Sequence, residues 1–367
     1  MRRHRTVDGP QGPLLSINGR ELLNFCSNDY LGLAGHPELK AALKEGVERY
    51  GVGAGASRLV CGHTSAHARL EERLAQFTQR ERALVFSTGY MANLALLNTF
   101  SGRSGVIIGD RMNHASLIDA ALLAGASLRR YQHADPRSLQ GLLEKTASAR
   151  NRLVVTESVF SMDGDIAPLP EIAGICRKAE VPLLVDDAHG FGVLGKNGGG
   201  ALEHFGLDMQ TVPLMMATFG KALGAFGAFI AGAAELIECL IQSGRSYIYT
   251  TALPPALAEA ASCALDLVVR ERWRAEQLHK LVARFRRGAL QLDLPVTDSV
   301  TPIQPLRIGD PRRAVELSDA LFEKGIFITA IRPPTVPKNT ARLRISLTAA
   351  HTEEQVDHLL SVLSDLF

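Results

Sequence analysis

Short strand-like runs alternate with amphipathic stretches over the first two thirds of the chain. Runs typical of buried strands occupy residues 83–87, 105–110, 127–132, 153–158 and 183–186. Hydrophobic residues spaced three or four positions apart predict helices over residues 37–50, 66–77, 88–100, 114–125 and 171–180. Strands that alternate with helices in this way are typical of an α/β domain with a mostly parallel sheet. Ligands of such domains bind at the carboxyl ends of the strands.

The two ends of the chain have a different texture. Residues 14–25 predict a hairpin that turns at Asn18-Gly19, and a polar loop follows at residues 27–29. After Pro254-Pro255 a helical stretch runs over residues 256–292. A smaller α+β unit follows, with strands at residues 303–309, 326–331 and 341–347 and helices at residues 314–324 and from 352 onward. We therefore expect an N-terminal segment (1–35), a large domain (36–265) and a small C-terminal domain (266–367).

One apolar stretch, residues 209–234, contains a single charged residue, Lys221. A membrane-spanning helix needs about 20 apolar residues, so the length alone would suffice. Pro213 and four glycines interrupt the stretch, however, and they favour short buried strands joined by a glycine-rich turn.

Composition narrows the possible partners. Forty basic residues against 38 acidic ones give a net charge of +2, which does not favour nucleic acid or an acidic membrane surface as a partner. The first ten residues lack the apolar region of a signal peptide. Five scattered cysteines without a CxxC pair predict neither a disulfide framework nor a zinc site. A cytoplasmic protein without a metal is the simplest interpretation.

Asp186 ends the apolar run LLVD and is followed by Asp187, Ala188 and His189. A metal ion would require more converging carboxylates, and a Walker B role would require a P-loop, whose GxxxxGK[ST] pattern is absent. A carboxylate at this place could instead keep the pyridine nitrogen of pyridoxal phosphate (PLP) protonated, with His189 near the phenolic oxygen. A turn cap beside a surface histidine is the alternative.

Lys221 raises a second question, because an unpaired ammonium group is costly in apolar surroundings. Desolvation lowers the pKa of an amine, and a Schiff base would remove the charge altogether. Thr218, one turn earlier, could bind a phosphate. The alternative is a lysine whose stem lies along a loop edge while its ammonium group reaches water.

Three further patterns have weaker meaning on their own. Gly89 and Tyr90 lie where a strand passes into a helix, a place where backbone N–H groups can bind phosphate. His114, at a similar turn, is either a helix cap or a planar group stacked on a ring. His63 and His67 are four residues apart but lack the glutamate of HExxH, so we expect them to flank the start of a helix.

Arg342 and Arg344 alternate on the predicted strand 341–347, so their side chains share one face. A pair of guanidinium groups on one face favours binding of a carboxylate. A solvated strand face is an equally simple interpretation.

Seven motifs resemble the α-oxoamine synthases, PLP-dependent enzymes of fold type I. They occur in the family's order, from about residue 24 to the C-terminus: FCSNDYLGL, STGYMAN, NHASLIDA, TESVFSMDGDIAPL, VDDAHGFGVLG, TFGKALG and IRPPTVPKNTARLRISLTAAHT. The resemblance implies a large domain with a mostly parallel seven-stranded sheet and a smaller α+β C-terminal domain. It also implies a homodimer.

The resemblance implies a role for each matching residue. Lys221 matches the lysine that forms the Schiff base, Asp186 the partner of the pyridine nitrogen, His189 the group near the phenolic oxygen, and His114 the histidine stacked on the ring. Other matches on the cofactor side are Gly89, Tyr90, Ser161, Thr218, Thr250 and Thr251, the last two reaching the phosphate of the partner subunit. Matches on the substrate side are Arg344 for the amino-acid carboxylate, Asn28, Thr335, and Arg2 or Arg3.

The motifs VDDAHGFGVLG and IRPPTVP resemble the branch of the family that acts in biotin biosynthesis. The implied reaction is the decarboxylative condensation of L-alanine with a pimeloyl thioester, of either CoA or a carrier protein. Its products are 8-amino-7-oxononanoate, CO2 and the free thiol carrier. The alternatives are a glycine-using 2-amino-3-oxobutyrate CoA ligase or a related synthase, and a catalytically silent partner subunit.

Overall fold

The computed structural model describes residues 4–367, which form two compact units. The large unit consists of residues 37–160 and 167–270, and the small unit contains the segments up to His36, 161–166 and 271–367. The expected N-terminal segment is therefore part of the small unit rather than a separate region. The loop 161–166 joins the small unit as well, although it interrupts the large unit in sequence.

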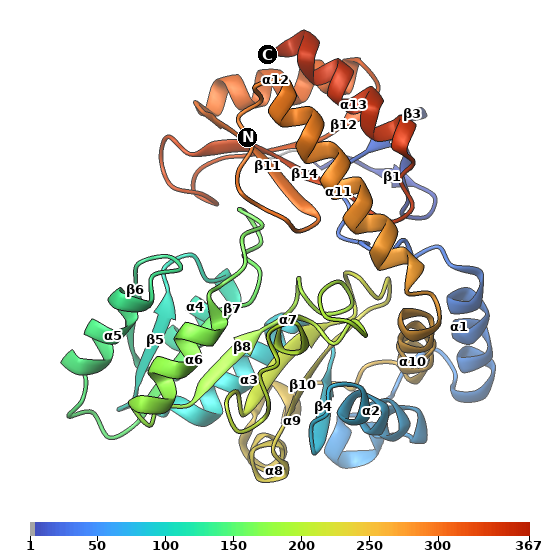
Figure 1. The fold of residues 1–367 in the computed structure, drawn as a ribbon. Helices are drawn as coiled ribbons and strands as arrows, with labels where there is room; N and C mark the ends of the chain where they lie inside the picture. The colour runs from blue at the N-terminus through green and yellow to red at the C-terminus, as the bar shows by residue number, and fades with distance from the viewer. Residues whose placement is uncertain (1–3) are drawn as a thin grey trace. The chain divides into compact units, whose positions relative to one another are not determined.

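A seven-stranded sheet forms the centre of the large unit (Figure 1). Its strands, in sheet order, are β4 (Arg82–Phe86), β10 (Ala228–Gly232), β9 (Leu214–Thr218), β8 (Leu183–Asp186), β7 (Arg152–Glu157), β5 (Val106–Asp110) and β6 (Ser127–Tyr131). β10 runs antiparallel to the other six strands of this sheet. The expected mostly parallel sheet of seven strands is confirmed. All four residues of β8 are buried, which explains why its sequence is an uninterrupted apolar run.

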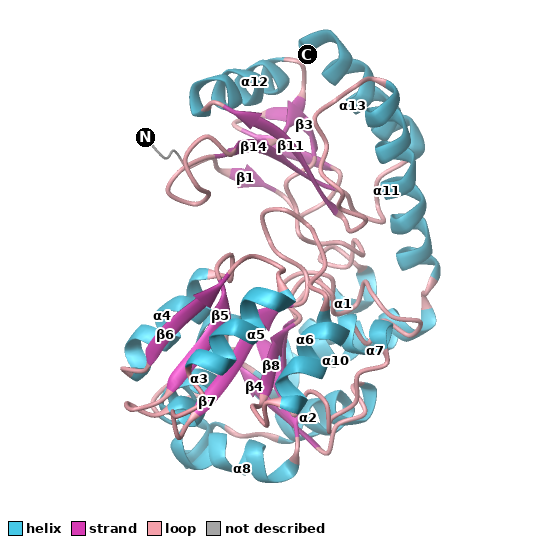
Figure 2. Ribbon diagram, turned by 60° about the vertical axis from the view of Figure 1, so that its left-hand side comes forward, coloured by secondary structure: helices cyan, strands magenta, loops and turns pink. Residues whose placement is uncertain are grey.

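Helices cover both faces of this sheet (Figures 1 and 2). On one face α3 (Gly89–Ser101) packs against α4 (Ala115–Ala124), α8 (Ala234–Ser243) and α9 (Arg245–Ile248). On the other face α5 (Pro136–Lys145) packs against α6 (Leu169–Lys178). Right-handed crossovers require this division, because the chain moves across the sheet in one direction through α3 and α4 and returns through α5 and α6.

The remaining helices of the large unit are α1 (Pro37–Tyr50), α2 (Ser65–Phe77), α7 (Ala201–Phe205) and α10 (Pro255–Arg270), with a π-helical turn at Arg58–Gly62. Helix α10 packs against both α1 and α2. Gly46 lets α1 approach α10 closely, since a Cβ atom at this position would lie 2.7 Å from the Cα atom of Ala256.

The small unit contains two sheets. One has four strands, in the order β1 (Val7–Asp8), β2 (Leu14–Ile17), β3 (Arg20–Asn24) and β12 (Ile326–Phe327), and β12 pairs parallel with β3. The other is antiparallel, in the order β11 (Ile303–Gly309), β14 (Ala341–Ser346) and β13 (Thr329–Ile331). The helices are α11 (Trp273–Gln291), α12 (Pro311–Glu323) and α13 (Glu353–Leu366).

Two expected elements are divided in the structure. The helical stretch expected over residues 256–292 is confirmed except at Glu271 and Arg272, where a turn separates α10 from α11. Each half packs within a different unit: α10 against α1 and α2, and α11 against α13. The strand expected over residues 326–331 is likewise two strands, β12 and β13, which belong to different sheets.

The apolar stretch 209–234 forms strands β9 and β10, as its glycines and proline predict. The turn between these strands carries Lys221. Among residues 4–367, no helix has both the length and the apolar composition needed to cross a membrane.

Candidate active site

The predicted cofactor residues of the large unit lie at one edge of its sheet. Gly89 and Tyr90 directly follow the loop after β4, and His114 follows β5. Asp186 is the last residue of β8, and Thr218 is the last residue of β9. Because parallel strands end at the same edge, chain segments far apart in the sequence meet there.

The carboxylate of Asp186 is buried, with the residue only 5% exposed. Its Oδ1 accepts a hydrogen bond from the backbone N–H of Ala188 at 3.0 Å, and its Oδ2 accepts one from Nδ2 of Asn93 at 2.9 Å. A carboxylate has about four acceptor positions, so two remain after these bonds. A cationic N–H group is the partner that a buried carboxylate favours most strongly.

His114 caps the N-terminus of α4. Its Nδ1 accepts a hydrogen bond from the backbone N–H of Ser116 at 3.2 Å and lies 2.8 Å from the hydroxyl of the same residue. The backbone N–H of His114 donates to the carboxylate of Glu157, at the end of β7. Ser116 thus holds the imidazole at Nδ1 and Glu157 holds the backbone of the same residue, while His114 as a whole remains exposed and can stack on a planar ring.

Charged neighbours have opposite effects on the pKa of the His114 imidazole. Partial desolvation lowers the pKa of its imidazole, Asp186 raises it, Lys221 lowers it and Asp119 raises it, with a net lowering. The neutral imidazole is therefore favoured at neutral pH. Both Asp186, at the end of β8, and Lys221, in the turn after β9, lie close enough to act on this ring.

Lys221 is half-buried in the turn between β9 and β10. Phe219, Ala222 and Leu223 around it are each at most 1% exposed. The hydroxyl of Thr218 donates to the carbonyl oxygen of Gly227 at 2.8 Å and accepts from the N–H of Gly220 at 3.2 Å. Thr218 thus holds the turn that carries the lysine. To bind a phosphate, its single hydroxyl proton would have to leave the carbonyl oxygen of Gly227.

The start of α3 provides a phosphate-sized set of donors. Thr88 is the N-cap and accepts from the N–H of Met91 at 3.2 Å, so Gly89 and Tyr90 are the first two helical residues. The first N–H groups of a helix have no partner within it, and the helix dipole favours an anion at this end. The phenol of Tyr90 donates to the carboxylate of Asp119 in α4.

These features fit PLP. A buried carboxylate can face the pyridine nitrogen, an exposed imidazole can stack on the ring, a lysine in an apolar turn can reach the aldehyde, and a helix N-terminus can bind the phosphate. His189 is also buried, at 5% exposure, in the turn that follows β8.

The small unit brings Arg344 together with Asn28 and Ser161. Nε of Arg344, on β14, donates to the carbonyl oxygen of Ser161 at 2.7 Å, and both terminal nitrogens lie 3.2 Å from Oδ1 of Asn28. One of them also donates to the hydroxyl of Ser346 at 2.7 Å. All of these partners are neutral, so within residues 4–367 this buried guanidinium has no carboxylate as a counterion.

Arg342, on the same face of β14, differs from Arg344. Its guanidinium forms an ion pair with the carboxylate of Asp163 and also donates to the carbonyl oxygen of Met162 at 3.3 Å. The sequence places both arginines on one face of the strand and matches Arg344 to the carboxylate-binding residue. Within residues 4–367, Arg342 has its charge balanced by a carboxylate and Arg344 does not.

The other predicted residues lie elsewhere. Thr250 and Thr251 follow α9, and Thr251 forms an isolated antiparallel bridge with Ser57. Thr335 is exposed in the loop between β13 and β14, where its N–H donates to the carbonyl oxygen of Arg332 at 3.1 Å. Arg2 and Arg3 lie outside the described residues.

His63 and His67 flank the start of α2, as predicted. Nδ1 of His67 accepts from the N–H of Thr64 at 3.1 Å, and its Nε2 lies 2.7 Å from the carbonyl oxygen of Leu253. Burial is the main cause that lowers the pKa of His67 to about 4. Both ring nitrogens of His67 are therefore used within the fold.

Sequence reasoning missed Asn93 and Ser116, which contact Asp186 and His114. Asn93 lies in the motif STGYMAN and Ser116 in the motif NHASLIDA, and both are buried. The available signal was polarity: Asn93 is an uncharged polar residue near the start of a largely apolar helix, a position where only a specific partner justifies burial.

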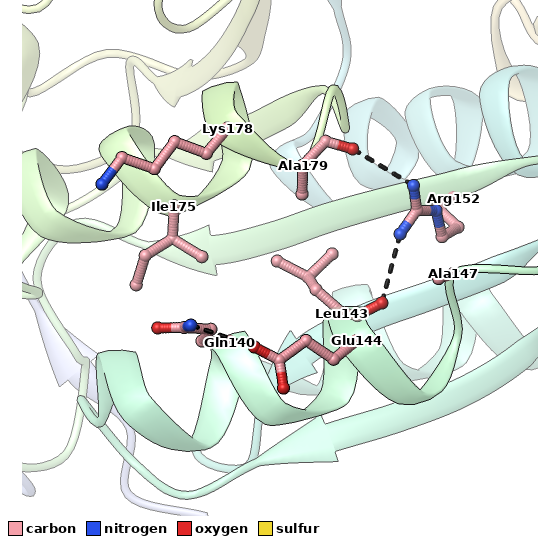
Figure 3. Close-up of a pocket in the computed structure, with 8 residues that line it drawn as sticks. All are labelled: Gln140, Leu143, Glu144, Ala147, Arg152, Ile175, Lys178 and Ala179. Atoms are coloured by element: carbon pink, nitrogen blue, oxygen red, sulfur yellow. Dashed lines mark hydrogen bonds between the residues drawn. The ribbon is translucent and has the colours of Figure 1, made fainter.

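A separate cavity of about 400 Å³ lies between α5 and α6 (Figure 3). It is lined by Gln140, Leu143, Glu144, Ala147, Arg152, Ile175, Lys178 and Ala179, none of which is a predicted site residue. Arg152, at the start of β7, donates to the carbonyl oxygens of Leu143 at 3.2 Å and Ala179 at 3.1 Å. Its guanidinium thereby binds the C-terminal ends of both helices, a structural role that helix dipoles favour.

Comparisons with known proteins agree with this geometry. The family model "Aminotransferase class I and II" matches residues 20–363. A protein of Thioalkalivibrio sulfidiphilus named 8-amino-7-oxononanoate synthase is 58% identical over 362 residues, which cover 99% of this chain and 92% of that protein. Further proteins of this name are 54–56% identical over 99% or more of the chain.

Solved structures give the same result. A serine palmitoyltransferase of S. paucimobilis with a bound PLP–myriocin aldimine has a TM-score of 0.95 at 30% identity, covering 99% of this chain and 92% of the other. An 8-amino-7-oxononanoate synthase of Francisella tularensis has a TM-score of 0.81 at 34% identity, covering 94% and 97%. The chain therefore belongs to the aminotransferase class I and II family of PLP-dependent enzymes, in the group formed by the 8-amino-7-oxononanoate synthases.

Proposed function

We propose that this enzyme condenses L-alanine with a pimeloyl thioester and releases CO2 and the free thiol carrier, giving 8-amino-7-oxononanoate for biotin biosynthesis. One observation carries the proposal: relatives that are 54–58% identical over almost the whole chain bear the name of the synthase that makes this product. The residues at the sheet edge provide the chemistry that such a reaction needs.

On the cofactor side, four residues have direct roles in the proposal. Nζ of Lys221 would hold the aldehyde of PLP and, as a free amine, would move the proton at Cα of the amino acid. Asp186 would accept the N–H of the pyridine ring, His189 would serve the phenolic oxygen, and His114 would stack on the ring. PLP, when bound, supplies the electron sink that stabilises a carbanion at Cα.

The phosphate is bound, in this proposal, by the start of α3. Gly89 and Tyr90 present the first N–H groups of the helix, and the 13-residue length of α3 gives its dipole full effect. Thr218 adds its hydroxyl from the end of β9. Ser161 belongs to the same proposed set, and its support is the match with the family motif.

We assign the amino-acid carboxylate to Arg344. A buried guanidinium with only neutral partners is unfavourable unless an anion completes the site, and a carboxylate can accept two parallel hydrogen bonds from it. Asn28, which contacts Arg344, and Thr335 are assigned to the substrate as well. Arg2 is assigned to the acyl substrate on the sequence match alone.

A homodimer is part of the proposal, with Thr250 and Thr251 reaching the phosphate bound by the partner subunit. Thr251 bridges Ser57, next to a loop that exposes apolar side chains. Val52 is 82% exposed and Val60 is 78% exposed, and Tyr249 beside the threonines is 71% exposed. Such exposure of apolar residues supports an interface between two copies of the chain.

The location that we propose is the cytoplasm. All five cysteines are free thiols, and Cys61 and Cys239 are exposed, which is compatible with a reducing compartment.

Product analysis tests the proposed reaction. Purified holoenzyme is incubated with L-alanine and pimeloyl-CoA, with L-alanine and a pimeloyl-carrier protein, and with glycine and acetyl-CoA, and products are identified by mass. We expect 8-amino-7-oxononanoate from alanine and a pimeloyl donor. Faster turnover of glycine with acetyl-CoA would instead assign the enzyme to the glycine-using ligases, and no product from any pair would identify a silent subunit.

A further inference from the structure

A continuous chain of hydrogen bonds connects the carboxylate of Asp186 to the imidazole of His114. Oδ2 of Asp186 lies 2.9 Å from Nδ2 of Asn93, and the same Nδ2 lies 2.8 Å from the hydroxyl oxygen of Ser116. That hydroxyl oxygen lies 2.8 Å from Nδ1 of His114. The two middle residues, Asn93 on α3 and Ser116 on α4, are each 1% exposed.

The chemistry of these groups fixes the direction of every bond. The carboxylate of Asp186 offers acceptors, so the amide of Asn93 must present its NH2 group to it. The second N–H of the same amide then points to Ser116, whose oxygen must accept it. The single proton of the Ser116 hydroxyl is thereby left for Nδ1 of His114.

A second donor confirms this direction at the imidazole. The backbone N–H of Ser116 also donates to Nδ1 of His114, at 3.2 Å, and a backbone N–H can never accept. Nδ1 thus faces two donors, so a proton on that nitrogen would displace both hydrogen bonds. The proton of the neutral ring belongs on Nε2.

This arrangement leaves the oxygen of the Asn93 amide unsatisfied. Its Oδ1 is buried and has no hydrogen-bond partner among residues 4–367. Turning the amide over would place this oxygen against the Asp186 carboxylate, which is worse, since two acceptors would then face each other. The orientation therefore serves Asp186 and Ser116 rather than the hydrogen bonding of Asn93 itself.

We propose that Asn93 and Ser116 are positioning residues that hold His114 as the neutral tautomer protonated on Nε2. The proposal rests on the proposed function, in which Asp186 and His114 contact the cofactor. The chain of bonds ties the orientation of the stacking imidazole to the carboxylate that faces the pyridine nitrogen. It presents the Nε2–H of His114 as a hydrogen-bond donor throughout the working pH range.

The charged groups around His114 are compatible with a neutral ring. Asp186 and Asp119 favour a protonated imidazole, whereas Lys221 and partial desolvation oppose it. Glu157 binds the backbone N–H of His114 rather than its ring. The two donors at Nδ1 therefore favour the neutral ring, because they occupy the lone pair of Nδ1 to which a second ring proton would have to bind.

Nitrogen NMR of the histidine rings tests the proposal. Holoenzyme labelled with 15N-histidine is measured as the unmodified protein and as the Ser116→Ala and Asn93→Ala variants, with His114→Gln identifying the His114 signals. In the unmodified protein we expect an unprotonated Nδ1, a protonated Nε2 and no titration between about pH 6 and 8. In both variants we expect a mixture of tautomers and an upward shift of the titration midpoint.

Asn98→Ala is the matched control. Asn98 lies on the same helix as Asn93 and also connects α3 to α4, with its Nδ2 2.8 Å from the carbonyl oxygen of Leu94 and 3.5 Å from that of Ala120. We expect its His114 signals to match those of the unmodified protein. Ser116→Thr, which restores a hydroxyl, should restore the single tautomer.

Two results would overturn the proposal: a proton on Nδ1 in the unmodified protein, or an unchanged tautomer in both alanine variants. Ser116→Ala removes one hydroxyl group and keeps the backbone donor, so it remains informative if Asn93→Ala does not fold. The NMR signals do not depend on which substrates are turned over, so failure of the proposed reaction would be recognised separately by product analysis.

Discussion

Asp187 and Ser158 are joined by a hydrogen bond between the side chains of two neighbouring strand ends, in which the serine hydroxyl donates to the carboxyl group. The other oxygen of Asp187 accepts from the backbone N–H of Ala201 at 2.9 Å. Asp186, the preceding residue, has different partners, Asn93 and Ala188. Two adjacent acidic residues thus have separate tasks: Asp186 at the candidate cofactor site, and Asp187 in fixing the start of α7.

The protonation of Asp187 should make stability depend on pH. Burial raises the pKa of Asp187 to about 7, against a value near 3.9 in an unfolded chain. Between about pH 4 and pH 7 the folded protein keeps this proton and the unfolded chain does not, so the free energy of unfolding falls as the pH rises through this window. We expect Asp187→Asn to flatten that dependence, as measured by urea unfolding at several pH values.

Asp298→Asn serves as the control for this measurement, since Asp298 is fully exposed and its variant should keep the original pH dependence. An unchanged slope for Asp187→Asn would show that Asp187 is already ionised in the folded protein at low pH.

Lys221 should be the single point of covalent attachment for PLP. Borohydride reduction of the holoenzyme should fix the cofactor on the peptide that contains Lys221. In Lys221→Ala it should fix none, while the cofactor still binds noncovalently. Turnover should fall at least about 10³-fold, because the variant lacks the amine that moves the Cα proton. Lys178→Ala, in the cavity between α5 and α6, should behave like the unmodified enzyme. Peptide mapping of an adduct on another lysine would contradict the assignment.

Arg344 and Arg342 should respond differently to replacement by lysine. Arg344→Lys keeps the charge and loses the planar fork that binds a carboxylate through two hydrogen bonds. Loss of about 1.5–3 kcal/mol corresponds to a roughly 10- to 150-fold weaker affinity for L-alanine. Spectral titration of the holoenzyme with alanine measures this change, and the spectrum without alanine should stay the same.

Arg342→Lys is the internal comparison, since Arg342 already pairs with Asp163. We expect its main effect on the free energy of unfolding rather than on alanine affinity. If Arg342→Lys weakens alanine binding and Arg344→Lys does not, the two roles are exchanged.

Gly46→Ala should destabilise the large unit. The added Cβ would lie 2.7 Å from the Cα atom of Ala256 and 3.1 Å from its Cβ atom, so α1 and α10 would have to separate. Overpacking of this kind costs about 1–3 kcal/mol, which exceeds the gain of about 1 kcal/mol from the better helix propensity of alanine. Gly174→Ala, in α6 with no atom within 4 Å of the added Cβ, should be neutral or stabilising in the same urea titration.

The sequence predicts most of the large unit because its signals are local. Helix α1 has the predicted bounds, and β7 and β8 are apolar runs because both faces of their sheet are covered. The turn at Glu271 and Arg272 was not predictable, since neither residue disfavours a helix. The break is imposed by packing, with α10 and α11 contributing to separate units.

In the candidate site, too, the sequence predicts features with local signals and misses those set by tertiary structure. Family motifs indicated Lys221, Asp186 and His114, and strand order explains why they meet at one sheet edge. The motifs matched Arg344 to the carboxylate-binding arginine, but they could not indicate the ion pair of Arg342 with Asp163, which depends on tertiary structure. Nor could they indicate the role of Asn93, whose partners are 23 and 93 residues away in sequence.

The parallel pairing of β3 with β12 has a consequence for synthesis of the chain. Leu23 is paired with Ile326, which a ribosome adding about 5–20 residues per second reaches roughly 15–60 s later. During that time the hairpin of β2 and β3 has an unpaired edge, and its apolar residues Leu15, Ile17 and Leu22 lack Phe322 and Phe327 as packing partners. The nascent chain therefore carries an aggregation-prone edge until β12 has been made, and β3 waits for its native partner while more than 300 residues are added.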